Sequence, residues 1–152
     1  EVEDATRAFQ RGVELNPSSA IVANGLAVSL IYVGKTDEAL ETLERLERID
    51  PIKHFDLQWN KAWALWQKGE CMKALDAFKS APSMPIAAYK HLAAIHYCLG
   101  SEDKAAKAMA DYLSENPGWT VSRVRDIESR MWTAPGALDR WLAAMEATGM
   151  PS

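Results

Sequence analysis

Long apolar runs, clusters of basic residues and cysteine motifs are all missing from this sequence. No apolar stretch approaches the roughly 18 residues of a membrane span, and no signal peptide opens the chain, so we expect no membrane partner. Acidic residues outnumber Lys and Arg by 21 to 17 and the net charge is −4, which argues against nucleic acid as a partner. The only cysteines, Cys71 and Cys98, form no paired motif. We therefore expect unpaired, core-packed thiols and a reducing, cytoplasmic compartment.

Signatures of catalysis and metal binding are missing as well. His91 and His96 stand five residues apart and do not share a helix face, and His54 falls in a predicted linker. Metal ligands on one helix need a spacing of four residues, with further ligands nearby. Gly-rich phosphate loops, nucleophile motifs and paired catalytic carboxylates are not found. The sequence predicts no catalytic residues, no metal site and no cofactor within these residues.

Helical periodicity is what the sequence contains. Apolar residues recur at i, i+3, i+4 and i+7 almost everywhere, as in Leu40, Leu43 and Leu46, and sustained period-2 alternation is absent. Connections of two to six residues make consecutive helices antiparallel neighbours. With 152 residues and 48% hydrophobic content, a single all-α domain is expected. The predicted helices are about 2–15, 18–33, 36–49, 55–68, 71–80, 84–99, 102–115, 120–132 and 135–148.

A unit of about 34 residues repeats along the chain. Gly34, Gly69 and Gly100 recur at intervals of 35 and 31 residues, and an alanine follows five residues after each of them. Four residues after each alanine stands a large apolar residue. The alanine lets two helices approach closely and the large side chain fills the space beside it. The matching pairs are Ala5 with Phe9, Ala39 with Leu43, Ala74 with Phe78, and Ala105 with Met109.

This pattern resembles the tetratricopeptide repeat, a helix–turn–helix unit of about 34 residues. The resemblance implies an α-solenoid of about nine helices, in which antiparallel hairpins stack into a right-handed superhelix. One extra residue near 51–54 and the short interval before Gly100 predict local kinks. The single domain 1–152 would comprise a half repeat at 1–17, repeats at 18–53, 54–84 and 85–118, and a capping helix pair at 119–152 with a more polar outer side.

The tail carries a second, narrower resemblance. Residues 116–125 and 135–142, with the final Gly149-Met150-Pro151, are similar to the C-terminal ending of many bacterial multidomain proteins. In those proteins a tetratricopeptide region follows a class III adenylate/guanylate cyclase domain or a winged-helix DNA-binding regulator domain, and the chain ends on a Gly-Leu-Pro-like triplet. The start at Glu1, within a predicted helix, agrees with a fragment. The resemblance implies the C-terminal regulatory part of such a protein.

The family resemblance also implies where a partner binds. In tetratricopeptide repeat proteins the first helix of each pair lines the concave surface, and partner peptides lie there. Carried over to this chain, together with the first helix of the capping pair, the predicted peptide-binding groove comprises Asn24, Val28, Tyr32, Trp59, Trp63, Trp66, Lys90, His91, Tyr97 and Arg125.

Three tryptophans on one helix have two interpretations. Trp59, Trp63 and Trp66 share a face by their spacing, distinct from the face of Ala62 and Leu65. If the latter two are the core contacts, the tryptophans face the groove as aromatic anchors. If the extra linker residue shifts the phase, Trp59 and Trp63 belong to the core instead.

Polar groove residues and the tail tryptophans lead to two partner hypotheses. Lys90 and His91, with Asn24 and Asn60, would bind a peptide backbone or terminal carboxylate, unless they form only a solvated polar face. The first hypothesis is therefore a module that binds a protein or peptide partner. The alternative is a homodimer that brings two attached domains together through exposed Trp132 and Trp141 on the capping helices.

Overall fold

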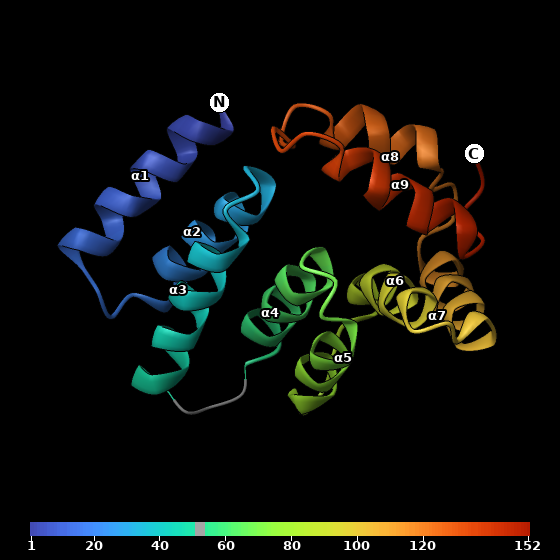
Figure 1. Ribbon diagram of the computed structural model, residues 1–152, viewed down its shortest axis with the longest axis horizontal. Helices are drawn as coiled ribbons and strands as arrows, with labels where there is room; N and C mark the ends of the chain where they lie inside the picture. The colour runs from blue at the N-terminus through green and yellow to red at the C-terminus, as the bar shows by residue number, and fades with distance from the viewer. Residues whose placement is uncertain (51–53) are drawn as a thin grey trace.

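The computed structural model describes residues 1–50 and 54–152, and within them the chain forms nine α-helices, one short 3₁₀ helix and no strand (Figure 1). None of these helices has the length and apolarity that a membrane crossing requires. The predicted all-α architecture is confirmed. The elements are α1 (Val2–Leu15), α2 (Ala20–Tyr32), α3 (Thr36–Ile49), α4 (Phe55–Gln67), α5 (Cys71–Ser80), η1 (Ile86–Ala88), α6 (Tyr89–Cys98), α7 (Glu102–Glu115), α8 (Val121–Glu128) and α9 (Ala137–Ala147).

The repeat residues pack the hairpins as their spacing predicts. Ala39 and Ala74 are completely buried, and Leu43 and Phe78 fill the space beside them. Each helix therefore packs against the next, with α2 on α3, α4 on α5 and α6 on α7. Burial of a large aliphatic or aromatic side chain stabilises the fold by about 1.5–3 kcal/mol.

Glycines end the first helix of each complete hairpin. At Gly34 the backbone is left-handed, with φ of 80°, and the N–H of Lys35 donates to Leu30 O at 2.9 Å. Gly69 repeats this arrangement, because Glu70 N donates to Leu65 O at 3.0 Å. These bonds satisfy carbonyls that the helix end leaves open, and a side chain at either glycine would be strained.

The first helices of the hairpins form an inner layer. Helices α2, α4 and α6 contact one another in sequence, while α1, α3, α5 and α7 lie on the other side of the hairpins (Figure 1). This is the arrangement of a solenoid. The kink predicted near 51–54 falls mainly on residues 51–53, which lie outside the described residues.

The C-terminal pair α8 and α9 lies against the inner layer. Helix α9 packs on α6, and Trp141 contacts Trp66 of α4 with ring centroids 5.4 Å apart. The turn between the two helices reaches α2, where Thr133 N donates to Tyr32 O at 3.1 Å. In Figure 1 the pair lies across from α2 and α4, and its connecting loop approaches the end of α2. Residues far apart in the sequence therefore meet on the concave side.

Two predicted helices are shorter than expected. The helix predicted at 84–99 is a 3₁₀ turn followed by α6, because Pro85 fixes an extended backbone just before it. The helix predicted at 120–132 ends at Glu128. Its continuation would take Thr133 away from Tyr32, and this tertiary hydrogen bond favours a turn instead.

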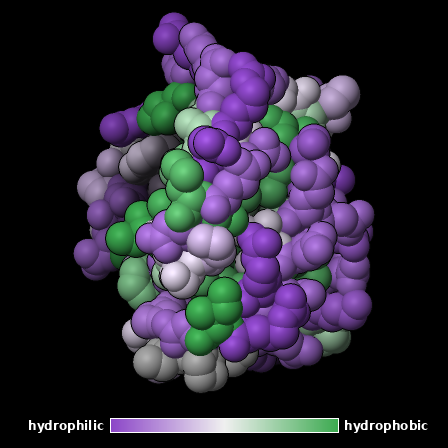
Figure 2. All heavy atoms as spheres, turned by 90° about the vertical axis from the view of Figure 1, so that its left-hand side faces the viewer, coloured by the Kyte–Doolittle hydropathy of each residue, from purple (hydrophilic) through white to green (hydrophobic). Residues whose placement is uncertain are grey.

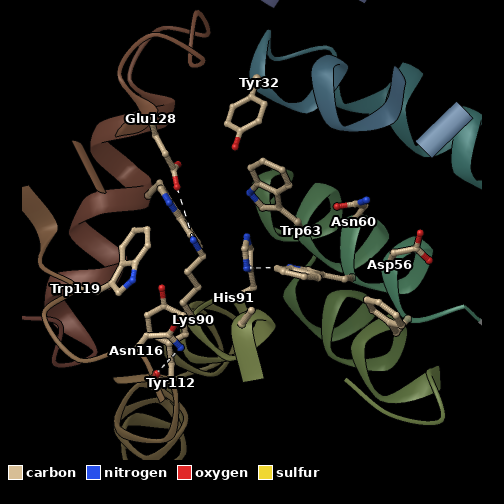
Figure 3. Close-up of a pocket in the computed structure, with 14 residues that line it drawn as sticks. Tyr32, Asp56, Asn60, Trp63, Lys90, His91, Tyr112, Asn116, Trp119 and Glu128 are labelled. Atoms are coloured by element: carbon tan, nitrogen blue, oxygen red, sulfur yellow. Dashed lines mark hydrogen bonds and ion pairs between the residues drawn. The ribbon is translucent and has the colours of Figure 1, made fainter. Parts of the chain in front are cut away.

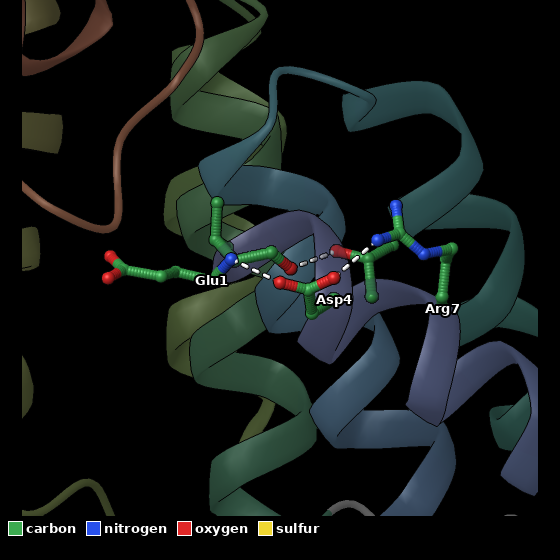
Figure 4. A network of polar contacts seen from close by, with 5 residues as sticks. Glu1, Asp4 and Arg7 are labelled. Atoms are coloured by element: carbon green, nitrogen blue, oxygen red, sulfur yellow. Dashed lines mark hydrogen bonds and ion pairs between the residues drawn. The ribbon is translucent and has the colours of Figure 1, made fainter.

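The N-terminal end of the molecule is largely charged. The Asp4 carboxylate accepts hydrogen bonds from the amino terminus and from Arg7 (Figure 4). Such exposed pairs contribute little stability, with a median of about 0–1 kcal/mol. Figure 2 shows hydrophobic residues between hydrophilic ones on this face, and Leu15 and Ile21 are among the most exposed large hydrophobic residues.

Candidate functional site

A pocket of about 410 Å³ opens on the concave side between the inner helices and the C-terminal pair (Figure 3). We call it the concave pocket. Its walls come from α2, α4, α6, α7, α8 and α9, so neither the repeats nor the C-terminal pair form it alone. The lining residues are Tyr32, Phe55, Asp56, Trp59, Asn60, Trp63, Ala87, Lys90, His91, Tyr112, Asn116, Trp119, Glu128 and Trp141.

Half of the residues predicted for the peptide groove meet in the concave pocket. They come from three different helices of the inner layer, and they are Tyr32, Trp59, Trp63, Lys90 and His91. The spacing of the repeats therefore brings these five side chains together.

The other predicted groove residues lie elsewhere. Asn24 and Val28 line a separate, more apolar hollow beside α1. Trp66 packs beneath Arg140, whose guanidinium carbon lies 5.5 Å from the indole centroid. Tyr97 is exposed outside the concave pocket, and Arg125 pairs at 3.3 Å with Asp139 on the outer side of α8 and α9.

The tryptophans of α4 combine the two interpretations of the sequence. Trp63 and Trp66 are core residues, with 6% and 8% exposure, whereas Trp59 stays partly exposed. Trp63 is buried between the C-terminal segment and α2: its ring lies 5.6 Å from Trp132 and 5.0 Å from Tyr32. It nevertheless forms a wall of the concave pocket. The contact with the C-terminal segment, which spacing within α4 does not reveal, decides its burial.

A hydrogen bond links Trp59 and His91, two side chains that line the concave pocket. Trp59 Nε1 donates to His91 Nδ1 at 3.0 Å (Figure 3). Burial lowers the pKa of His91 well below its usual value, and the neighbouring Lys90 charge lowers it further. His91 is thus a neutral imidazole that accepts at Nδ1, which leaves the proton on Nε2. The prediction of a solvated polar face is wrong for His91, which is buried.

Lys90 lies deeper in the pocket than its predicted position on an open groove. Its ammonium is 3.8 Å from Glu128 and within 6 Å of the ring centroids of Tyr112 and Trp119. Burial lowers the pKa of Lys90, and the Glu128 carboxylate opposes this shift. The aromatic faces partly replace lost hydration through cation–π attraction. Glu128 also accepts from Trp132 Nε1 at 2.9 Å, so this carboxylate joins α6 to the C-terminal turn.

The part of the pocket that lies beyond the repeats is not among the residues predicted for the groove. Trp119 and Trp141 form walls, and Asn116 and Tyr112 lie at one side. The sequence did contain one indication of it. The tail has three tryptophans, Trp119, Trp132 and Trp141, which is unusual for a cap with a polar outer surface. The self-association hypothesis assumed that Trp132 and Trp141 are exposed. Both are buried, with 7% and 1% exposure.

The prediction of unpaired core cysteines is also wrong. Cys71 and Cys98 form a disulfide, with Cα atoms 6.3 Å apart, and Cys98 is exposed. Cys71 begins α5 and Cys98 ends α6, and the packing of these helices brings together residues 27 positions apart. The cysteines therefore give no support for a reducing compartment, because disulfides persist mainly in oxidising ones.

The neutral state of His91 predicts a loss of stability in mild acid. Below the unfolded-state pKa of about 6.5 the unfolded chain binds a proton that folded His91 refuses. The free energy of unfolding should fall from pH 7 to pH 5.5, with a limiting slope of about 1.4 kcal/mol per pH unit from this group. Urea denaturation across this range measures the slope.

His91→Asn keeps an acceptor for Trp59 and removes the titrating ring, so its slope should be flatter than that of the unmodified protein. The matched control His54→Asn changes an exposed histidine and should retain the slope. An unchanged slope in His91→Asn would contradict a neutral, buried His91.

The fold and the pocket define a class of protein: an α-solenoid of helical hairpins with an aromatic pocket on its concave side. Its sequence matches the tetratricopeptide repeat family over residues 1–51 and again over 26–87, more than half of the chain. The chain therefore belongs to the tetratricopeptide repeat family. Tetratricopeptide folds are non-enzymatic scaffolds for protein–protein interaction, and this chain is such a scaffold.

Solved structures share the fold at low sequence identity. A crystal structure of MamA is 19% identical with a TM-score of 0.64, and the match covers 97% of this chain and 86% of that chain. MamA 41-end from Desulfovibrio magneticus RS-1 is 17% identical with a TM-score of 0.62, covering 96% and 85%. Identities this low show the fold alone. No curated protein sequence matches the chain significantly.

Proposed function

We propose that this chain is a recognition module that holds a short segment of a partner protein in the concave pocket. The observation that carries the proposal is the convergence of Tyr32, Trp59 and His91 from three inner helices on one aromatic pocket. A pocket of about 410 Å³ falls within the usual range for ligand sites and admits one or two residues of a peptide.

The rim of the pocket suits an extended peptide. Phe55 and Asp56 are exposed there, and Trp59 and Asn60 are partly exposed, so a ligand reaches them without unfolding the chain. Asn60 Nδ2 donates to Asn24 Oδ1 at 2.9 Å, and Asn24 Nδ2 donates to Asp56 at 3.3 Å. This chain of hydrogen bonds fixes the rim amides, and fixed polar groups beside aromatic anchors give orientation as well as affinity.

We further propose that the single domain 1–152, divided into a half repeat, three repeats and a C-terminal pair, serves a larger bacterial signalling or regulatory protein. The tail residues that resemble the ends of cyclase-like and winged-helix regulator proteins support this context. The alternative, self-association, was suggested by exposed tryptophans on the capping helices, but Trp132 and Trp141 are buried. Light scattering on concentrated protein tests it, and a stable dimer would restore it.

Substitutions at the rim test peptide recognition. Peptides selected by display on the folded protein should bind Trp59→Ala about 10–100-fold more weakly, as expected on losing an aromatic anchor. Asn60→Ala should weaken binding by a smaller factor, because it removes one hydrogen-bonding group. Titration calorimetry with a selected peptide measures both changes.

Tyr97→Ala is the matched control for this experiment. Tyr97 is an exposed aromatic residue of the same layer, but it lies outside the concave pocket. Its substitution should leave peptide affinity unchanged. If Tyr97→Ala weakened binding while Trp59→Ala did not, the binding surface would lie elsewhere on the solenoid.

A further inference from the structure

Two indole N–H groups in the walls of the concave pocket have no acceptor among the described residues. They belong to Trp63 and Trp141, which are 6% and 1% exposed. A buried donor without an acceptor costs about 1–3 kcal/mol, so such groups are rare in folded proteins. Trp66 shows the ordinary situation, since its Nε1 donates to Ala94 O at 3.2 Å.

Two further donors accompany these indoles. His91 accepts from Trp59 at Nδ1, so its Nε2 carries the proton, and Figure 3 shows this second nitrogen on the side of the ring away from Trp59, facing the interior. The Lys90 ammonium is the other donor, 3.8 Å from its carboxylate partner and therefore beyond hydrogen-bond distance. In the same view the Trp63 nitrogen lies on the indole edge that faces Lys90 and Glu128.

The Lys90 ammonium and the Glu128 carboxylate balance each other's charge in this interior. Glu128 is next to Lys90, and its other oxygen already accepts from Trp132. Asp56 lies at the exposed rim and accepts from Asn24, so the interior itself holds one ammonium and one carboxylate, those of Lys90 and Glu128. A charged ligand would be buried there without a free counter-charge: an anion would also meet Glu128, and a cation would meet Lys90 and the N–H donors. A ligand that accepts hydrogen bonds without carrying charge satisfies both conditions.

We infer that the interior of the concave pocket recognises an uncharged amide carbonyl next to an apolar or aromatic side chain, through the N–H groups of Trp63, Trp141 and His91. The inference rests on the proposed function and specifies it. The segment bound is an internal stretch of a partner chain, whose backbone carbonyl enters the pocket and whose side chain packs on the aromatic walls. A terminal carboxylate is disfavoured, because Lys90 is already paired with Glu128 and the added negative charge would be buried without a partner.

Three probes with the same ring and different polar groups test this inference. Indole-3-acetamide offers a neutral acceptor, indole-3-acetate a carboxylate, and tryptamine an ammonium. Each is titrated into nitrogen-15-labelled protein, and the indole N–H signals of the six tryptophans are followed by nuclear magnetic resonance. Trp63→Phe and Trp141→Phe assign the two signals of interest.

Indole-3-acetamide should bind about tenfold more tightly than either charged probe and should move the Trp63 and Trp141 N–H signals downfield, as hydrogen bonding does. Trp63→Phe, which keeps a ring and removes the donor, should weaken this binding several-fold. The matched control Trp66→Phe changes a tryptophan outside the pocket and should not weaken it.

Tighter binding of the acetate or of tryptamine would overturn the neutral-acceptor assignment, and so would binding that leaves both N–H signals unmoved. Absence of binding by all three probes would overturn it as well. These outcomes are separate from those of peptide display. Peptides that depend on Trp59 while the amide probe fails would leave the recognition module standing and reject only this interior site.

Discussion

Replacing Trp141 with alanine should lower the free energy of unfolding by about 3–5 kcal/mol, the range for truncation of a fully buried tryptophan. Trp141 is 1% exposed, and its ring lies 5.4 Å from Trp66 and 4.6 Å from His91. The side chain therefore holds α9 against α4 and α6 together. Urea denaturation of the variant and the unmodified protein measures the change.

The helices that Trp141→Ala destabilises first also test the packing of the C-terminal pair. If Trp141 anchors the C-terminal pair, hydrogen exchange in Trp141→Ala should increase first in α8 and α9, and less in α2 and α3, which pack on each other without it. Trp119→Ala is a matched control. Trp119 is only partly buried, so its substitution should lower the free energy of unfolding by less. A loss under about 1 kcal/mol for Trp141→Ala would contradict the packing of α9 on the inner layer.

The C-terminal pair also shapes the concave pocket through its contacts with the inner layer. Arg140 donates to Gln67 O at 3.0 Å, Thr133 donates to Tyr32, and Glu128 approaches Lys90, so the pair contacts each of the three inner helices. It thereby supplies Glu128 and Trp141 to the concave pocket, and the connection before α8 supplies Trp119. In an open solenoid Tyr32 and Trp63 would line a wide groove. Here the pair narrows that groove to a pocket of about 410 Å³.

Local patterns in the sequence predict the repeats well. Alanine followed by a large apolar residue, and glycine at the end of the preceding helix, specify each hairpin because both requirements are local to about ten residues. Ala39 with Leu43 and Ala74 with Phe78 pack as predicted. The regular interval then brings α2, α4 and α6 side by side, which is why five of the residues predicted for the groove meet although they come from three helices.

The rest of the site depends on contacts that no local pattern contains. The C-terminal pair lacks the repeat signature, so periodicity predicts its two helices but not the surface they cover. Trp132 and Trp141 illustrate this limit: their spacing is equally suited to an exposed face and to burial against Tyr32 and Trp66. The pairing of Cys71 with Cys98 has the same origin, since it follows from the packing of α5 and α6.

Reduction of the Cys71–Cys98 disulfide should destabilise the domain by about 3.5 kcal/mol at 25 °C, the chain-entropy value for a loop of this size. The two cysteines are 27 residues apart and join the start of α5 to the end of α6. Urea denaturation with and without a phosphine reductant measures the difference, and alkylation followed by mass spectrometry counts the free thiols in each sample.

Cys98→Ser is the control that isolates the bond from the reductant, because it replaces the exposed partner and leaves Cys71 in the core. Its stability should equal that of the reduced protein and should not respond to reductant. Since α6 carries Lys90 and His91, loosening its end should also weaken peptide binding in the concave pocket, although neither cysteine lines that pocket. Equal stability of the oxidised and reduced protein would show that helix packing alone holds α5 and α6 together.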